Sequence, residues 1–182
     1  MSTLKELTAH SHARAENTPF MRLFMAKALT EEEYMEYITQ LSVIYTALEF
    51  AAEKVGILQE LDGIQRASKV RADVYELNKK LGKQSKIYWE TVMYYNEITR
   101  MTERDEILAH FYVRYAGDMY GGQMLKPLAH GSGTMYDFDD KLPVLRQKMR
   151  ELATPELADD ANMAFSRTID VVNCTITPVG KF

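Results

Sequence analysis

The chain has 182 residues, of which 46% are hydrophobic and 26% are charged, a composition typical of a globular domain with a sizeable core. A formal net charge of -4 argues against nucleic-acid binding. The single Cys174 excludes an internal disulfide framework and a cysteine metal cluster. The polar N-terminus lacks a signal-peptide core and no apolar stretch could span a bilayer, so we expect a cytoplasmic protein without membrane partners.

The first half of the chain carries clear helix signals. The N-terminal segment that holds His10 and His12 reads as helix, and residues 30–55 open with Thr30 and Glu33 in a capping box. Residues 63–82 repeat the helical pattern and end at a glycine. In the segment 30–55 the apolar residues recur at spacings of three and four, on one helical face: Met35, Ile38, Leu41, Ile44, Tyr45 and Leu48.

The second half continues in the same way. Residues 85–101 predict a further helix, with a break near Tyr95, and residues 106–130 predict a long one. Two more helices are expected over residues 139–154 and 155–173.

No alternating strand pattern, internal repeat or low-complexity segment stands out. Residues 131–140, rich in glycine and aspartate, predict the clearest flexible connection. The sequence therefore predicts an all-α fold with seven or eight helices, organised as a single domain over residues 1–182.

The most unusual feature is a glycine cluster within the predicted helix 106–130. Gly117, Gly121 and Gly122 each cost a helix roughly 1 kcal/mol relative to alanine. Gly117 and Gly121 are four residues apart, so they fall on nearly one face and leave a bare strip. Tight helix packing is one explanation, and a large flat ligand lying against the strip is another.

Two charged residues flank this strip. Arg114 and Asp118 are four residues apart and can pair along the helix. On an open surface such a pair contributes little, whereas beside a cavity it could hold ordered water and organise a proton relay.

The histidines supply a candidate for the opposite side of such a ligand. His12 has Glu16 four residues later, so that the carboxylate can orient one ring nitrogen and leave the other as a metal ligand. An exposed ion pair is the simpler reading of this spacing. Lys5, seven residues before His12, could meet an anionic group, and His110 is expected to be a core histidine.

Other metal sites find less support. A carboxylate-bridged di-iron centre requires Glu-x-x-His, and the spacing from Glu106 to His110 has one residue too many. A lone axial histidine on a flat cofactor, with the sixth position of the iron open, is the more economical arrangement.

The segments HSHARAEN (residues 10–17) and HFYVRYAGDMYGGQMLK (residues 110–126) together resemble the heme oxygenase family. SVIYTALE (residues 42–49) and, more loosely, LRQKMRELATP (residues 145–155) extend this resemblance over most of the chain, from Lys5 to Phe165. The resemblance implies an all-α bundle in which heme lies between a proximal and a distal helix.

The resemblance also implies roles for individual residues. His12 would be the axial ligand of the heme iron, with Glu16 as its partner, and Gly117, Gly121 and Gly122 would lie along the distal face. Asp118 would anchor a distal water network, supported by Tyr45 and Arg114. The remaining heme contacts implied are Lys5, Tyr112 and Arg146 at the propionates and Phe165 at the pocket wall.

Two features depart from the family pattern. Tyr120 occupies a position that is usually small, so it either points away from the heme or narrows the distal pocket. The C-terminus is short, which resembles forms without a membrane anchor.

The reaction implied is the oxidative cleavage of heme to biliverdin, with the α isomer expected, together with CO and Fe²⁺. It requires O2 and electrons, and the sequence shows no flavin or nicotinamide site, so an external donor such as an acidic ferredoxin is expected. Basic residues could steer it: Arg14, Arg22, Lys126, Lys141, Arg146, Lys148 and Arg150.

Two alternatives remain at this point. A heme carrier or sensor would bind heme without turnover, and Asp118 favours an enzyme because a carrier needs no distal proton relay. The same fold acting on non-heme metals or thiamin-like substrates is disfavoured by the missing Glu-x-x-His pairs.

Overall fold

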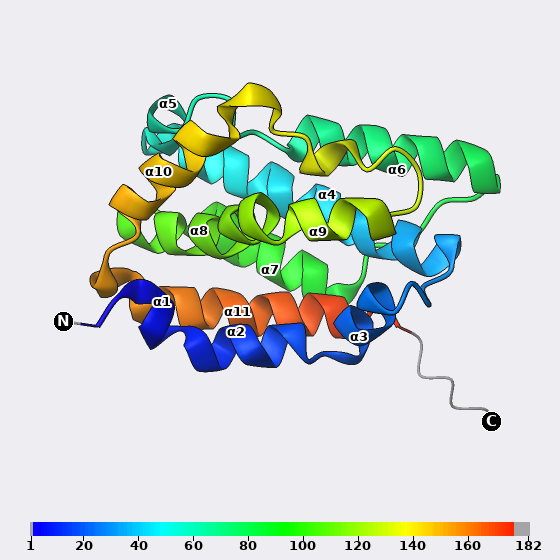
Figure 1. Cartoon of the computed structure of the whole chain (residues 1–182), viewed down its shortest axis with the longest axis horizontal. Helices are drawn as coiled ribbons and strands as arrows, with labels where there is room; N and C mark the ends of the chain where they lie inside the picture. Colours follow the sequence, from blue (N-terminus) through cyan, green and yellow to red (C-terminus); the bar gives the residue numbers. More distant parts are fainter. Residues whose placement is uncertain (1, 177–182) are drawn as a thin grey trace.

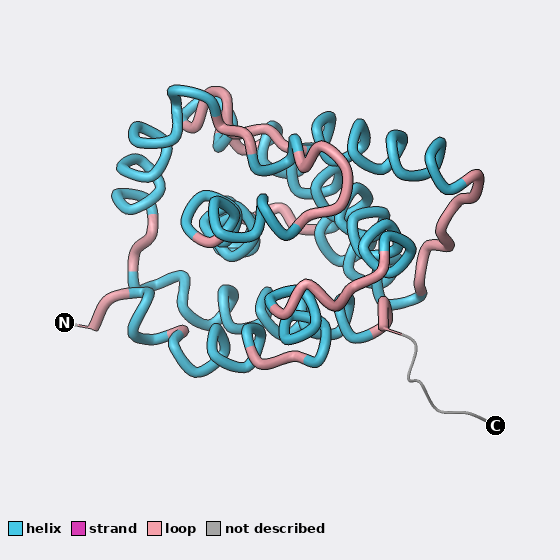
Figure 2. Tube along the Cα trace, turned by 45° about the vertical axis from the view of Figure 1, so that its right-hand side comes forward, coloured by secondary structure: helices cyan, strands magenta, loops and turns pink. Residues whose placement is uncertain are grey.

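The computed structural model describes residues 2–176, and no strand occurs in that range (Figure 2). The all-α prediction is therefore confirmed. The helices are α1 (Leu4–Leu7), α2 (Ala9–Glu16), α3 (Pro19–Met25), α4 (Glu31–Lys54), α5 (Ile57–Glu60), α6 (Ala67–Leu81), α7 (Trp89–Arg100), α8 (Arg104–Tyr120), α9 (Gly122–Leu125), α10 (Leu142–Leu152) and α11 (Ala158–Asn173), with short 3₁₀ turns η1 (Lys126–Leu128), η2 (Thr134–Tyr136), η3 (Asp139–Lys141) and η4 (Pro155–Leu157).

Helix α4 is the centre of the fold. Thr30 caps its first turn in the predicted capping box, accepting from the Glu33 amide at 3.1 Å while the Glu33 carboxylate accepts from the Thr30 amide at 2.8 Å. The helix packs against α6, α7 and α8 (Figure 1). All six apolar residues predicted on its face are buried, which explains why a helix of this length is stable here.

A second layer is built on α11. This helix packs against α8 on one side and against α2 on the other, so it connects the N-terminal helices to the glycine-containing helix (Figure 1). Segments far apart in the sequence are thereby brought to one side of the molecule.

Four predicted helices begin three or four residues later than the sequence suggested, among them α10 at Leu142 and α11 at Ala158, and one predicted break was wrong. The helix expected over residues 85–101 begins at Trp89 and runs without a break, so the interruption near Tyr95 does not occur. The helix expected over residues 63–82 begins at Ala67, where the Glu49 carboxylate accepts from the backbone amide at 2.8 Å. Its end is as predicted, with Gly82 in the left-handed conformation at φ 66°.

The long helix predicted over residues 106–130 is interrupted. Helix α8 ends at Tyr120, Gly121 forms a turn, and α9 and η1 continue the segment. The glycine cluster therefore lies at a helix junction.

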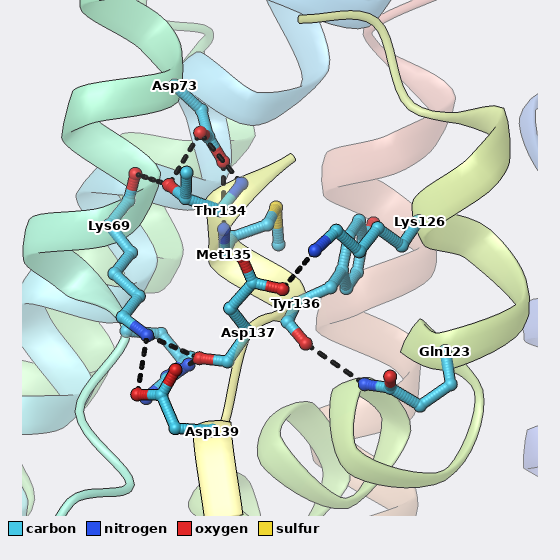
Figure 3. Close-up of polar contacts among 10 residues, drawn as sticks. Lys69, Asp73, Gln123, Lys126, Thr134, Met135, Tyr136, Asp137 and Asp139 are labelled. Carbon is cyan, nitrogen blue, oxygen red and sulfur yellow. Dashed lines mark hydrogen bonds and ion pairs between the residues drawn. The ribbon is translucent and has the colours of Figure 1, made fainter. Parts of the chain in front are cut away.

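The connection 131–140 is not the flexible loop that its composition predicts, because tertiary contacts hold it (Figure 3). The buried Asp73 carboxylate on α6 accepts from the backbone amides of Thr134 and Met135, both at 2.9 Å. The Gln123 side chain on α9 donates to the Tyr136 carbonyl at 2.9 Å, and Lys126 pairs with Asp137. The connection thus holds α9 in place relative to α6.

Within residues 2–176, the helices longer than four residues number eight, in agreement with the seven or eight predicted. In the same range, none of the helices combines the length and apolarity needed to cross a membrane.

Candidate functional site

His12 is presented by α2 with its ring accessible. The side chain is 56% exposed, and Nδ1 lies 3.5 Å from a carboxylate oxygen of Glu16, one turn further along the helix. The ring also packs edge-on against Phe165 of α11, with the ring centroids 5.7 Å apart and an interplanar angle of 85°. These two contacts restrain the imidazole and direct Nδ1 to the carboxylate, which leaves Nε2 for an external ligand.

The three glycines serve different purposes. Gly117 is exposed, and a Cβ placed on it would meet nothing within 4 Å. The polypeptide therefore gives no packing reason for glycine at this position, although glycine costs helix stability. Gly117 presents bare main chain to open space.

The other two glycines have local reasons. The Gly121 amide donates to the Gly117 carbonyl at 2.7 Å, and a Cβ on Gly121 would lie 3.0 Å from that oxygen. A Cβ on Gly122 would lie 2.6 Å from Cδ1 of the buried Tyr136 ring. Gly122 thus allows the close approach of the connection 131–140, and its predicted heme contact stays a prediction.

Behind Gly117 lies a buried polar cluster. Tyr45 on α4 donates a hydrogen bond to the Asp118 carboxylate. Arg114, one turn earlier on α8, places Nη2 3.8 Å from the other carboxylate oxygen and 3.5 Å from the Tyr45 hydroxyl. The prediction that Tyr45, Arg114 and Asp118 act together matches this geometry.

Burial dominates the electrostatics of the cluster. Asp118 is 4% exposed, and loss of solvent raises the pKa of its carboxyl well above the usual range. A raised pKa favours the protonated form of the carboxyl, and a group that can take up and release a proton is a candidate for acid–base chemistry.

A small cavity of about 10 Å³ adjoins the cluster, and sequence reasoning did not find it. It is lined in part by Tyr94, Arg114 and Thr168. Within residues 2–176, the buried Nε of Arg114 and Oγ1 of Thr168 have no hydrogen-bond partner. The volume suits a single water molecule. No spacing motif relates these residues, because they come from three different helices.

His110 is a core histidine, as expected. It is buried on α8, with Nδ1 2.8 Å from the Tyr94 hydroxyl. Burial lowers the pKa of the imidazole to about 4, so the ring is neutral in ordinary buffers.

The three residues predicted to contact the heme propionates lie on three different helices. Lys5 is exposed on α1, a separate helix from the α2 that carries His12, and its predicted propionate contact stays a prediction. Tyr112 is half-buried on α8, and burial raises the pKa of its hydroxyl. Arg146 lies on α10 and donates from Nε to the Met119 carbonyl at 3.0 Å. Tyr120 turns toward Arg146, with the guanidinium 5.0 Å from its ring centroid.

The basic residues expected to attract a donor do not form one free patch. Lys126 pairs with Asp137, and Lys141 pairs with Asp62 at 2.8 Å. Lys148 and Arg150 are exposed on α10, where Lys148 donates to the Glu60 carbonyl at 2.9 Å, and Arg14 and Arg22 are exposed on α2 and α3. In the part of the chain that the structure describes, no group of three or more His, Cys, Asp or Glu side chains could hold a metal ion.

Known proteins match this chain along most of its length. Residues 1–173 match the model of the family described as heme oxygenase. Heme oxygenase 1 of Synechocystis sp. is 29% identical over 94% of this chain and 82% of its own length. Heme oxygenase of Porphyra purpurea is 31% identical over 75% of this chain and 65% of its own length.

Solved structures show the same fold. The crystal structure of heme oxygenase-1 from the cyanobacterium Synechocystis sp. in complex with heme superposes with a TM-score of 0.79, covering 93% of this chain and 89% of that chain at 24% identity. Heme oxygenase from Leptospira interrogans superposes with a TM-score of 0.81 over 93% of this chain and 96% of that chain, at 22% identity. Because the family model covers residues 1–173 and the relatives and the fold agree with it, the chain belongs to the heme oxygenase family and is an enzyme of oxidative heme cleavage.

Proposed function

We propose that the enzyme opens the heme ring at the α position, consuming O2 and electrons from an external donor and releasing biliverdin IXα, CO and Fe²⁺. Heme supplies both the redox-active iron and the ring that is opened. The single observation that carries the site assignment is Gly117: an exposed helical position whose missing side chain the protein itself does not need.

His12 would bind the iron through Nε2. Its accessibility, its restraint by Phe165 and its proximity to Glu16 all suit an axial ligand. A single histidine ligand would leave the opposite side of the iron open to O2.

Asp118 would hold and move protons on the distal side. Its raised pKa, its hydrogen bond from Tyr45 and the position of Arg114 support this role. Water between Arg114 and Thr168 would connect the cluster to the interior of the bundle. Because the carboxylate is buried behind Gly117, a proton would reach the reacting centre through water and not by direct contact.

The donor would be an acidic ferredoxin. Lys148 and Arg150, exposed on α10, are the positive charges that best support such docking. Electrostatic steering of this kind weakens with ionic strength, because surface charges are screened over about 10 Å at 0.1 M salt.

The test is turnover of hemin by the purified protein under air, with ferredoxin and its reductase or with ascorbate. The Soret band should disappear and a broad red bilin absorption should replace it, with the α isomer identified by chromatography. A protein that keeps its Soret band with both donors would be a heme carrier or sensor, contrary to the proposal.

Two variants with matched controls test the residue roles. Asp118→Ala should slow ring opening while hemin still binds, whereas Asp105→Ala, at an exposed aspartate on the same helix, should not. His12→Ala should abolish the Fe–N(His) stretch in resonance Raman spectra of the ferrous complex, and His10→Ala should retain it. An unchanged stretch in His12→Ala would rule out the ligand assignment.

A further inference from the structure

Hydrogen bonds run in both directions between the end of α8 and α10, and we call the contacts between Tyr120, Arg146 and Met119 the brace. The Tyr120 hydroxyl, on α8, donates to the Arg146 carbonyl on α10 at 3.3 Å. The Arg146 side chain donates back to the Met119 carbonyl on α8, from Nε at 3.0 Å and from Nη2. The Tyr120 ring also lies 5.0 Å from the guanidinium, within range of a cation–π contact.

The brace orients the Arg146 guanidinium and leaves some of its N–H donors free for another partner. A guanidinium has five N–H donors, and the two bonds to the Met119 carbonyl leave three of them available. Because Met119 is in the last turn of α8, its carbonyl is one of the groups that a helix end leaves without an intrahelical partner. Arg146 is thus oriented by main chain that lies within two residues of Gly117 and Gly121.

Arg146 is one of the residues whose proposed partner is a heme propionate. Tyr120 contacts Arg146 through both its hydroxyl and its ring. A side chain that is 44% exposed would otherwise have little reason to be a large aromatic at a helix end.

We propose that Tyr120 is a positioning residue: through the brace it sets the angle at which Arg146 meets a heme propionate, and thereby which meso carbon lies beneath Gly117. This inference rests on the proposed function, since it takes the propionate contact of Arg146 as given. Tyr120 touches neither iron nor the reacting carbon, and its effect is on the rotational seating of the macrocycle.

The test is the isomer composition of the biliverdin released. Tyr120→Ala removes both the hydroxyl bond and the ring, and the ratio of the α isomer to the others should fall about tenfold. Tyr120→Phe keeps the ring over the guanidinium, and the fall should be about threefold. Arg146→Lys should resemble Tyr120→Ala, because an ammonium lacks the planar fork. Tyr75→Ala, at an exposed tyrosine on α6, is the control and should leave the ratio unchanged.

Two further measurements separate positioning from a structural role. Wild-type protein given heme dimethyl ester, which has no propionate charge, should already yield mixed isomers, and Tyr120→Ala should add nothing to that mixture. Binding affinity is measured by titration of the Soret band. In Tyr120→Ala the affinity for hemin should fall, whereas the affinity for heme dimethyl ester should not.

Several outcomes would overturn the inference. A wild-type isomer ratio in both Tyr120→Ala and Tyr120→Phe would show that the brace serves stability alone. Failure of the proposed function has a different signature, because the wild-type protein would then release no bilin with any donor, and the inference would fall with it.

Discussion

Replacing Gly117 with alanine separates the needs of the fold from those of the reaction. A Cβ on Gly117 meets nothing within 4 Å, so the ligand-free protein accommodates it without strain. Alanine in place of a helical glycine stabilises by roughly 1 kcal/mol. For a chain of 182 residues this corresponds to a rise in Tm of roughly 2–4 °C.

The same methyl group should damage turnover. If heme lies against the bare main chain at Gly117, the methyl displaces either the macrocycle or the bound oxygen. A displacement of about 1 Å at a reacting centre costs on the order of 100-fold in rate. The variant is therefore expected to be more stable than the wild-type protein and a much poorer enzyme.

The matched control is Gly122→Ala. Its Cβ would lie 2.6 Å from Tyr136, a buried ring that the connection 131–140 holds in place. Overpacking of this kind costs about 1–3 kcal/mol, so this variant should lose stability. Thermal unfolding of the ligand-free proteins and single-turnover bilin formation give both quantities. A Gly117→Ala variant with wild-type turnover would refute the assignment of the bare strip to heme.

Three further predictions follow from the charges. Asp118→Asn should raise the free energy of unfolding at pH 7. Burial raises the pKa of the Asp118 carboxyl, so as the pH rises above the ordinary aspartate pKa of about 4 the unfolded chain ionises more readily than the folded one and wild-type stability falls. In urea titrations the gain of the variant should shrink as the pH falls toward 4, while bilin formation is impaired at every pH. Between pH 6.5 and 4 the wild-type protein should lose about 3 kcal/mol of unfolding free energy, because the unfolded histidine binds a proton that the folded His110, with a pKa of about 4, does not. His110→Gln should remove this loss. An equally steep pH profile in the variant would contradict the reasoning. Reversing the charges of Lys148 and Arg150 to glutamate should raise the KM for ferredoxin and weaken its salt dependence, while turnover driven by ascorbate stays the same; an unchanged KM would place the donor elsewhere.

Much of the fold could be predicted from local pattern. The capping box at Thr30 and Glu33, the apolar face of α4 and the end of α6 at Gly82 are properties of short sequence windows, and the structure confirms each. The connection 131–140 could not be predicted in this way. Its glycines and aspartates indicate flexibility, but Asp73, more than sixty residues earlier, accepts hydrogen bonds from the backbone amides of Thr134 and Met135.

The candidate site shows the same contrast between features that follow from local sequence and features that depend on long-range contacts. The sequence by itself predicted the residue pairs to which we assign the chemistry: His12 with Glu16, and Arg114 with Asp118, are one helical turn apart, and the structure brings each pair together. The family resemblance implied that Tyr45 supports Asp118, and the structure forms that hydrogen bond. Only the tertiary structure decided that Thr168 adjoins Arg114 and that Tyr120 braces Arg146. The physical reason is that these contacts join separate helices, whose relative placement depends on how the whole core packs. The same packing shows that Gly122 makes room for Tyr136, while Gly117 is bare without a structural need.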